Sequence, residues 1–178
     1  MVYLFMAKGF EEIEAVTPVD LLRRVDVDVQ IVGVGERLVE GAHGIVYQSD
    51  ITEDEIDVNL IDMIILPGGT EGTANLENND TVKKAITFCV ENQKPIAAIC
   101  AAPSILGKMG LLKNKKATCY PGLEHCLEGA VFGDKKVYAD GLFITSKGPG
   151  TSMDFGLAIV EFLLGEETAK RLASQMQY

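Results

Sequence analysis

Short apolar runs alternate along the chain with segments whose apolar residues recur at helical spacing. Strand-like runs occupy residues 2–6, 27–34, 63–66, 96–99, 116–119, 137–139 and 142–145, with a hairpin-like excursion at 38–48. Helical patterns occupy residues 12–25, 80–91, 102–109, 152–164 and 168–173. Strands that are apolar throughout need cover on both faces, so this alternation predicts a mostly parallel α/β sheet with helices on each side.

Capping residues place several helix ends. Asp80 is expected to cap the helix at 80–91, and Thr151 or Ser152 the helix at 152–164. Glycines at 110 and 165 are expected to end two helices. The acidic stretch at 53–62 is interpreted as a solvated helix or loop rather than a metal site.

Length and charge limit the classes of protein. The 178 residues fit one domain, and 47% of them are hydrophobic, enough for a substantial core. A net charge of −10 argues against nucleic acid and anionic membranes as partners. The first six residues resemble a strand rather than a signal peptide, and no apolar stretch is long enough to span a bilayer.

Cysteine usage indicates free thiols. The chain has four cysteines and two histidines but no C-x-x-C pair, so we expect neither a zinc site nor any other metal or cofactor. A reducing, cytoplasmic location follows as an expectation. Cys89 falls within a predicted helix and is expected in the core, whereas the sequence leaves the roles of Cys119 and Cys126 open.

Cys100 is the strongest chemical signal. It ends the apolar run PIAAIC, and Ala101, Ala102 and Pro103 follow at once, which predicts a strand, a tight elbow and a helix. A thiol near a helix N-terminus is expected to have a lowered pKa, because the helix dipole favours the thiolate. The same activation would make the sulfur sensitive to oxidants.

Glu14 is the candidate partner of that thiol. Together with Pro18, Leu21, Leu22 and Val25 it forms one helical stripe, so an acidic residue lies on an otherwise apolar face. Burial would raise its pKa and let it donate a hydrogen bond to a thiolate or move a proton on a substrate. The alternative is that the acidic residues at 11, 12 and 14 only complement the helix N-terminus.

Glycine turns follow two other strands. Gly68 and Gly69, after Pro67, would allow close approach of a ligand, and with the N–H of Ala101 they could form an oxyanion hole. An ordinary strand-ending turn is the competing interpretation. Gly148 and Pro149 open the next predicted helix, and helix initiation alone explains them. The turns at 7–9, 67–69 and 100 are expected to meet at the carboxyl ends of the strands.

Neither histidine is an obvious base for the thiol. His125 follows the Tyr120-Pro121 dipeptide and could reach the site, although a surface position is favoured. His43 lies in the hairpin excursion and is expected to be exposed or at an interface.

Four segments together resemble the ThiJ/PfpI superfamily. They are AKGFEEIE at 7–14, LPGG at 66–69, AAICAAP at 97–103 and TSKGPGTS at 145–152, in order across almost the whole chain. The branch that they resemble is that of the parkinsonism-associated protein deglycase and its bacterial relatives. The resemblance implies a flavodoxin-like, doubly wound α/β sandwich and a homodimer.

The resemblance also assigns residue roles. It implies that Cys100 is a strained nucleophile-elbow cysteine and that Glu14 is its buried, protonated partner. It further places Gly69 and Ala101 at an anion pocket. Arg24 corresponds to an arginine near the dimer interface.

Two positions depart from the pattern. Tyr120 stands where human-type members have a pocket histidine, and a phenol is a poor base at neutral pH. His43 stands where some relatives have an interface arginine. The protease-like branch has a histidine directly after the cysteine, whereas this chain has Ala101, so proteolysis is not expected.

Three functional hypotheses follow. The first is a cofactor-independent glyoxalase or deglycase-like enzyme, in which Cys100 attacks a small reactive carbonyl and Glu14 is the acid and base. The second is an oxidative-stress sensor or chaperone-like protein, in which oxidation of Cys100 to sulfinate is the signal. The third keeps the fold and the dimer and gives Cys100 no role.

Overall fold

A seven-stranded sheet organises the computed structural model, which describes residues 1–178. The strands run in the order β5-β2-β1-β6-β7-β9-β8, and all pairs are parallel except β8 with β9. The five central strands are β2, β1, β6, β7 and β9. Counted in chain order these five are the second, first, third, fourth and fifth, which is the strand order of flavodoxin-like doubly wound folds. The predicted fold class is therefore confirmed. The strand bounds are β1 Val2–Ala7, β2 Val29–Val34, β5 Ile51–Thr52, β6 Met63–Leu66, β7 Ile96–Ile99, β8 Val137–Asp140 and β9 Phe143–Ser146.

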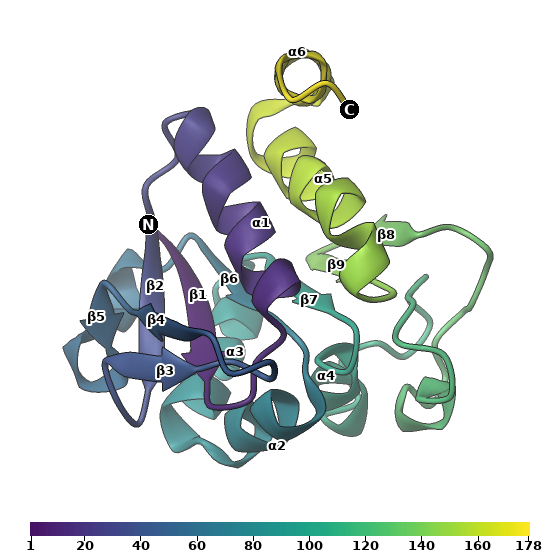
Figure 1. Cartoon of the computed structure of the whole chain (residues 1–178). Helices are drawn as coiled ribbons and strands as arrows, with labels where there is room; N and C mark the ends of the chain where they lie inside the picture. Colours follow the sequence, from purple (N-terminus) through teal and green to yellow (C-terminus); the bar gives the residue numbers. More distant parts are fainter.

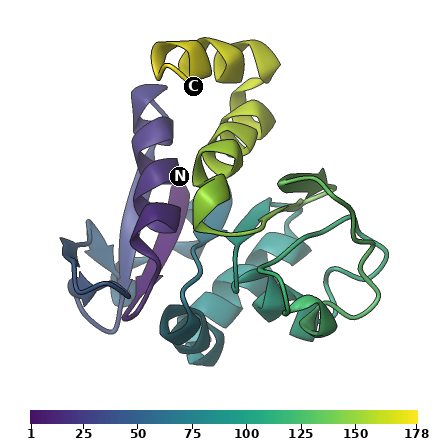
Figure 2. The same ribbon diagram turned by 45° about the vertical axis from the view of Figure 1, so that its right-hand side comes forward.

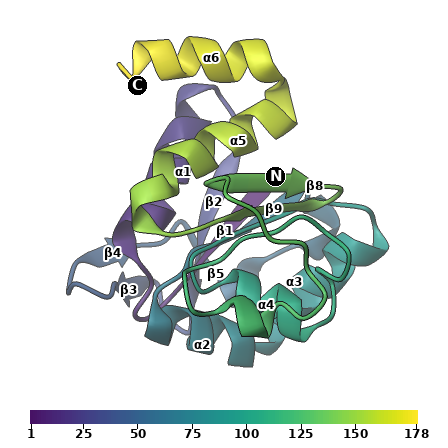
Figure 3. The same ribbon diagram turned by 90° about the vertical axis from the view of Figure 1, so that its right-hand side faces the viewer.

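Helices cover both faces of the sheet, as Figures 1 and 3 show. On one face lie α1 (Glu12–Arg24) and α5 (Ser152–Leu164); on the other lie α2 (Thr70–Asn78), α3 (Asp80–Glu91) and α4 (Pro103–Lys108). The last helix, α6 (Glu166–Gln175), crosses the C-terminal ends of α1 and α5 (Figure 2). Short 3-10 turns occupy Glu53–Glu55, Val58–Leu60, Glu124–Cys126 and Pro149–Thr151.

Two cores of 22 buried residues each lie on opposite faces of the sheet. Alternate residues of a strand point to opposite faces, so Leu4 and Met6 join the α1–α5 core while Tyr3 and Phe5 join the α2–α4 core. Burial on both faces is why the strands are apolar without alternation. No helix is both long and apolar enough to cross a bilayer.

Several expected boundaries shift. The cap of α3 is Asn79 rather than Asp80, because the Asn79 side chain accepts the N–H of Val82 at 3.0 Å. The expected strand at 116–119 is reduced to a single bridge between Lys116 and Val131. Thr151 precedes α5 but makes no side-chain cap, and α6 is longer than the pattern at 168–173 predicts.

One further small sheet reaches the site. β3 (Leu38–Glu40) and β4 (Val46–Gln48) form the predicted antiparallel hairpin. The hairpin lies beside the N-terminal end of α1 in Figure 1. The N–H of Gly9 donates to Glu40 at 2.8 Å and the N–H of Ala42 donates to Phe10 at 2.8 Å, so the hairpin tip is fixed to the turn after β1.

Candidate active site

Cys100 occupies the elbow between β7 and α4. Its φ is +65°, in the left-handed region that non-glycine residues rarely adopt, and such a conformation costs about 1–3 kcal/mol. Its N–H donates to the Ser146 carbonyl at 3.0 Å, and its own carbonyl accepts the N–H of Tyr120 at 2.8 Å. Bonds on both sides of the residue therefore hold the strained elbow, and the expectation of strained geometry is met.

Glu14 points inward from the first turn of α1 and is fully buried. Its Oε2 accepts the N–H of Gly68 at 2.8 Å, whereas its Oε1 is buried and has no hydrogen-bond partner. Burial is the main reason that the pKa of Glu14 rises to about 7. A buried carboxylate oxygen without a donor disfavours the charged form. The structure therefore supports the interpretation that Glu14 faces the interior, rather than the alternative that it only complements the dipole at the N-terminus of α1.

Gly68 brings Glu14 and Cys100 together. A Cβ on Gly68 would lie 2.6 Å from Cys100 Cβ and 2.6 Å from Glu14 Oε2, so only glycine fits between them. Gly69 has a φ of +92° and packs against the carbonyl of Gly9. The turns after β1, β6 and β7 thus meet at the carboxyl ends of the strands, as predicted.

The protonation of Cys100 differs from the expectation. Burial first, and then the neighbouring Glu14 carboxylate, raise the pKa of the Cys100 thiol to about 12, while the N–H groups of Gly69 and Ala101 act in the opposite direction. The expectation of a lowered thiol pKa is therefore wrong, because burial alone opposes ionisation of the thiol and the Glu14 carboxylate adds to it.

The Cys100 sulfur opens onto a surface pocket of about 350 Å³. The pocket is lined by Glu11, Ala42, His43, Gly69, Thr70, Cys100, Ala101, Tyr120, Leu123 and Pro149. Tyr120 forms one side of the pocket and is half exposed. Gly148 lies next to both Tyr120 and Cys100, because a Cβ on Gly148 would be 3.3 Å from the Tyr120 ring and 4.0 Å from Cys100 Sγ. No lysine or arginine lines the pocket; its one carboxylate belongs to Glu11 and its one imidazole to His43.

The sequence did not reveal an ion pair beside this pocket. Glu12 is buried, and its carboxylate accepts the backbone N–H of His43 at 2.7 Å and lies 2.7 Å from Nδ1 of the same residue. The hydrogen bond to Glu12 raises the pKa of His43. Burial alone would raise the pKa of Glu12, but the hydrogen bonds from His43 outweigh it, and the pKa of Glu12 is lowered. Glu11, Glu12 and His43 offer ligand atoms within 4.8 Å of one another, but both Glu12 oxygens already bind His43.

Other candidates lie outside the pocket. Arg24 is at the opposite end of α1, half exposed, with its Nε 2.7 Å from Asp20. His125 is exposed and contacts the Gly122 carbonyl and the Cys126 sulfur rather than Cys100. Cys89 is buried in the core as expected, and all four cysteines are free.

A cysteine on a strained strand-to-helix elbow, paired with a buried glutamate, defines a nucleophile-elbow protein of the flavodoxin-like type. The chain belongs to the DJ-1/PfpI family, whose pattern it matches over residues 1–162. It is 38% identical over 174 residues to the protein DJ-1 homolog B of Arabidopsis thaliana, covering 96% of this chain and 40% of the relative. The chain thus spans less than half the length of that relative.

Other relatives match over most of both chains. "Deglycase PfpI" of Pyrococcus furiosus is 33% identical over 153 residues, which is 84% of this chain and 92% of the relative. A DJ-1 superfamily protein of Salmonella typhimurium has a TM-score of 0.94 at 35% identity, with 99% and 97% of the two chains covered. The oxidised DJ-1 of Toxoplasma gondii has a TM-score of 0.94 at 30% identity, with 99% and 97% covered.

Proposed function

We propose that this protein is a Cys100-dependent, cofactor-independent enzyme acting on small reactive carbonyl compounds of the methylglyoxal type. The observation that carries the proposal is the pairing of a strained pocket cysteine with a fully buried glutamate whose pKa is about 7. A carboxyl that titrates near neutral pH is suited to both giving and taking a proton. The printed name of the Pyrococcus relative, a deglycase, agrees with carbonyl chemistry.

The first step is capture. The Cys100 sulfur adds to the aldehyde carbon, and the proton that the thiol and Glu14 share goes to the aldehyde oxygen, giving a hemithioacetal. The N–H groups of Gly69 and Ala101, which interact with the Cys100 sulfur, stabilise negative charge as the oxygen forms.

The second step is proton transfer. Glu14, now a carboxylate, removes the hydrogen from the former aldehyde carbon and returns it to the neighbouring carbon through an enediol, which converts the hemithioacetal to a thioester. Water then cleaves the thioester, releasing the hydroxy acid and regenerating the thiol. Methylglyoxal plus water becomes lactate, with no net oxidation and no co-reactant.

The decisive assay measures lactate formed from methylglyoxal by wild type, Cys100→Ser and Glu14→Gln. Cys126→Ser is the matched control, because Cys126 is a free cysteine outside the pocket. We expect Cys100→Ser to be inactive, Cys126→Ser to match wild type, and Glu14→Gln to form the Cys100 adduct without turnover. Equal rates for Cys100→Ser and wild type would overturn the proposal, and full turnover by Glu14→Gln would remove the role of Glu14.

A second candidate function is oxidative sensing through Cys100. Cys100 lines an open pocket that small oxidants can enter, and the solved structure of a relative with the same fold is of an oxidised protein. Two equivalents of peroxide would convert the thiol to sulfinate with release of two waters. Intact mass and peptide mapping after near-stoichiometric peroxide test this function: two oxygens confined to Cys100 favour it, and oxidation scattered over other cysteines and methionines contradicts it.

A further inference from the structure

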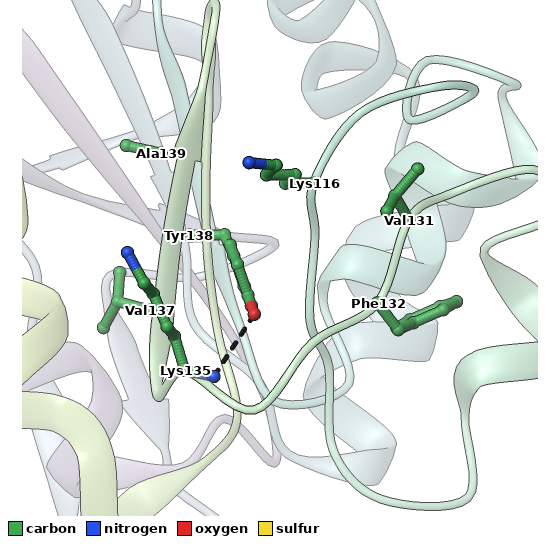
Figure 4. Close-up of a pocket in the computed structure, with 7 residues that line it drawn as sticks. All are labelled: Lys116, Val131, Phe132, Lys135, Val137, Tyr138 and Ala139. Carbon is green, nitrogen blue, oxygen red and sulfur yellow. Dashed lines mark hydrogen bonds between the residues drawn. The ribbon is translucent and has the colours of Figure 1, made fainter.

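The far edge of the sheet carries a second cavity, away from Cys100. It measures about 330 Å³ and is lined by Lys116, Val131, Phe132, Lys135, Val137, Tyr138 and Ala139. Figure 4 shows Tyr138 projecting from β8 toward the 131–135 segment, with Lys116 across the gap. None of these residues lines the Cys100 pocket, so the cavity is a separate feature.

One wall of the cavity is an unpaired strand edge. β8 is the last strand of the sheet, and β9 is its only strand partner. No backbone hydrogen bond joins residues 137–140 to any segment other than β9. Alternate N–H and C=O groups of an edge strand point away from the sheet, so this edge presents donors and acceptors to another extended chain.

The opposite wall is formed by two short segments, residues 115–117 and the segment at Val131, that hydrogen-bond to each other. The N–H of Ala117 donates to Val131 at 3.1 Å, and the N–H of Val131 donates to Lys115 at 2.8 Å. At one end the N–H of Lys116 donates to the Asp140 carboxylate at 2.8 Å; at the other the N–H of Lys135 donates to the Tyr138 hydroxyl at 3.2 Å. These two bonds connect β8 to the opposite segments at the two ends of the gap, and the free edge of β8 lies between them.

Charge at this edge is opposite to that of the whole chain. Residues 113–147 contain six lysines and four acidic residues, whereas the full chain has 26 acidic and 16 basic residues. Lys116 and Lys135 are exposed and form no ion pair, while Lys115 and Lys136 are paired with Asp140 and Asp154. Val131 and Phe132 add exposed apolar surface on the wall opposite β8, where Val131 pairs with Lys116, whereas the Lys135 amino group lies along β8 beside Val137 (Figure 4).

We propose that this cavity, lined by β8, Lys116 and residues 131–135, is a docking site for an extended acidic peptide segment of another protein. The segment adds to the free edge of β8 through main-chain hydrogen bonds, which is the general mode of β-augmentation. Its carboxylates pair with Lys116, which lies across the gap from Tyr138, and with Lys135, whose amino group lies along β8 and turns toward the bound peptide; its apolar side chains contact Val131 and Phe132. A cationic peptide is excluded by the same two lysines.

The test uses fluorescence anisotropy with a labelled Glu-Val-Glu-Val-Glu peptide and the full chain. We expect saturable binding that added salt weakens and that a Lys116→Glu/Lys135→Glu double variant weakens by about tenfold or more. Lys84→Glu is the matched control, because Lys84 is also exposed and without an ion pair but lies on α3. Circular dichroism verifies that each variant is folded.

Two further probes separate edge pairing from simple charge attraction. The same peptide with N-methyl groups on alternate amides keeps its charge but loses strand pairing, and we expect it not to bind. In wild type, amide hydrogen exchange at residues 137–139 should slow when the unmodified peptide binds. The proposal is wrong if wild type shows no saturable binding up to about 1 mM peptide, if the double variant binds like wild type, or if the methylated or lysine-containing peptide binds equally well.

Discussion

Replacing Glu14 by Gln should change the pH dependence of stability in a defined direction. Burial raises the pKa of Glu14 to about 7 from its usual 4.5. Between those two values Glu14 holds a proton in the folded protein but has released it in the unfolded chain. The contribution of Glu14 to the free energy of unfolding is therefore fully present below the pKa of the unfolded state, and it is lost as pH rises through the pKa of the folded state. Glutamine resembles the protonated acid and cannot titrate, so this loss disappears in the variant.

The size of the effect follows from the shift. Each pKa unit corresponds to about 1.4 kcal/mol, so the complete difference is about 3 kcal/mol. Between about pH 5 and about pH 8, the stability of Glu14→Gln relative to wild type should rise by about 2–3 kcal/mol. In a chain of this length that corresponds to a relative gain in melting temperature of very roughly 4–12 °C.

Urea unfolding of wild type and Glu14→Gln, followed by far-ultraviolet circular dichroism at both pH values, measures this difference. The comparison cancels the titration of all other groups. Glu128→Gln is the control, because Glu128 is an exposed carboxylate, and its relative stability should stay constant. A change below about 1 kcal/mol for Glu14→Gln, or one of opposite sign, would refute the reasoning.

Three other changes test particular contacts. Gly68→Ala should destabilise the fold by about 1–3 kcal/mol, because the added Cβ would overlap Cys100 and Glu14. Gly150→Ala is the control, because a Cβ at Gly150 would have no atom within 4 Å. Equal melting temperatures for the two variants would contradict the packing argument. Asn79→Ala should lose about 1 kcal/mol in urea unfolding while Asp80→Ala loses less, because only Asn79 caps α3; the reverse order would restore Asp80 as the cap. Glu11→Gln should increase capture of anionic glyoxylate relative to neutral methylglyoxal by Cys100, because Glu11 is a carboxylate in a pocket rim without lysine or arginine; an unchanged adduct ratio by mass spectrometry would exclude this charge effect.

The features that the sequence predicted are those encoded locally. The uninterrupted apolar run before Cys100 specifies a doubly covered strand, and the small residues and Pro103 after it specify a turn into a helix. The stripe that places Glu14 inward is a property of one helix, and it holds although Pro18 lies within that helix. In each case the informative residues are neighbours in the chain.

The features that it missed depend on contacts between distant segments. The pairing of Glu12 with His43 joins residues 31 positions apart and forms only because the β3–β4 hairpin docks on the turn after β1. The helix α2 has little apolar periodicity, and it is held by close packing of Gly72 against Phe10. Neither contact leaves a regular pattern in one sequence.

The direction of the Cys100 pKa is the most instructive difference, because burial, its first cause, is reinforced by the partner that the sequence did identify. A helix N-terminus favours a thiolate, but a buried carboxylate beside the sulfur opposes a second negative charge in the same site. With the pKa of Glu14 raised to about 7 and that of Cys100 to about 12, the two groups together hold one proton above neutral pH. In the proposed reaction, that single proton goes to the new hydroxyl during capture of the aldehyde, which leaves Glu14 ionised for the next step. On this proposal the sulfur is activated by its partner during the reaction rather than by its position at a helix end.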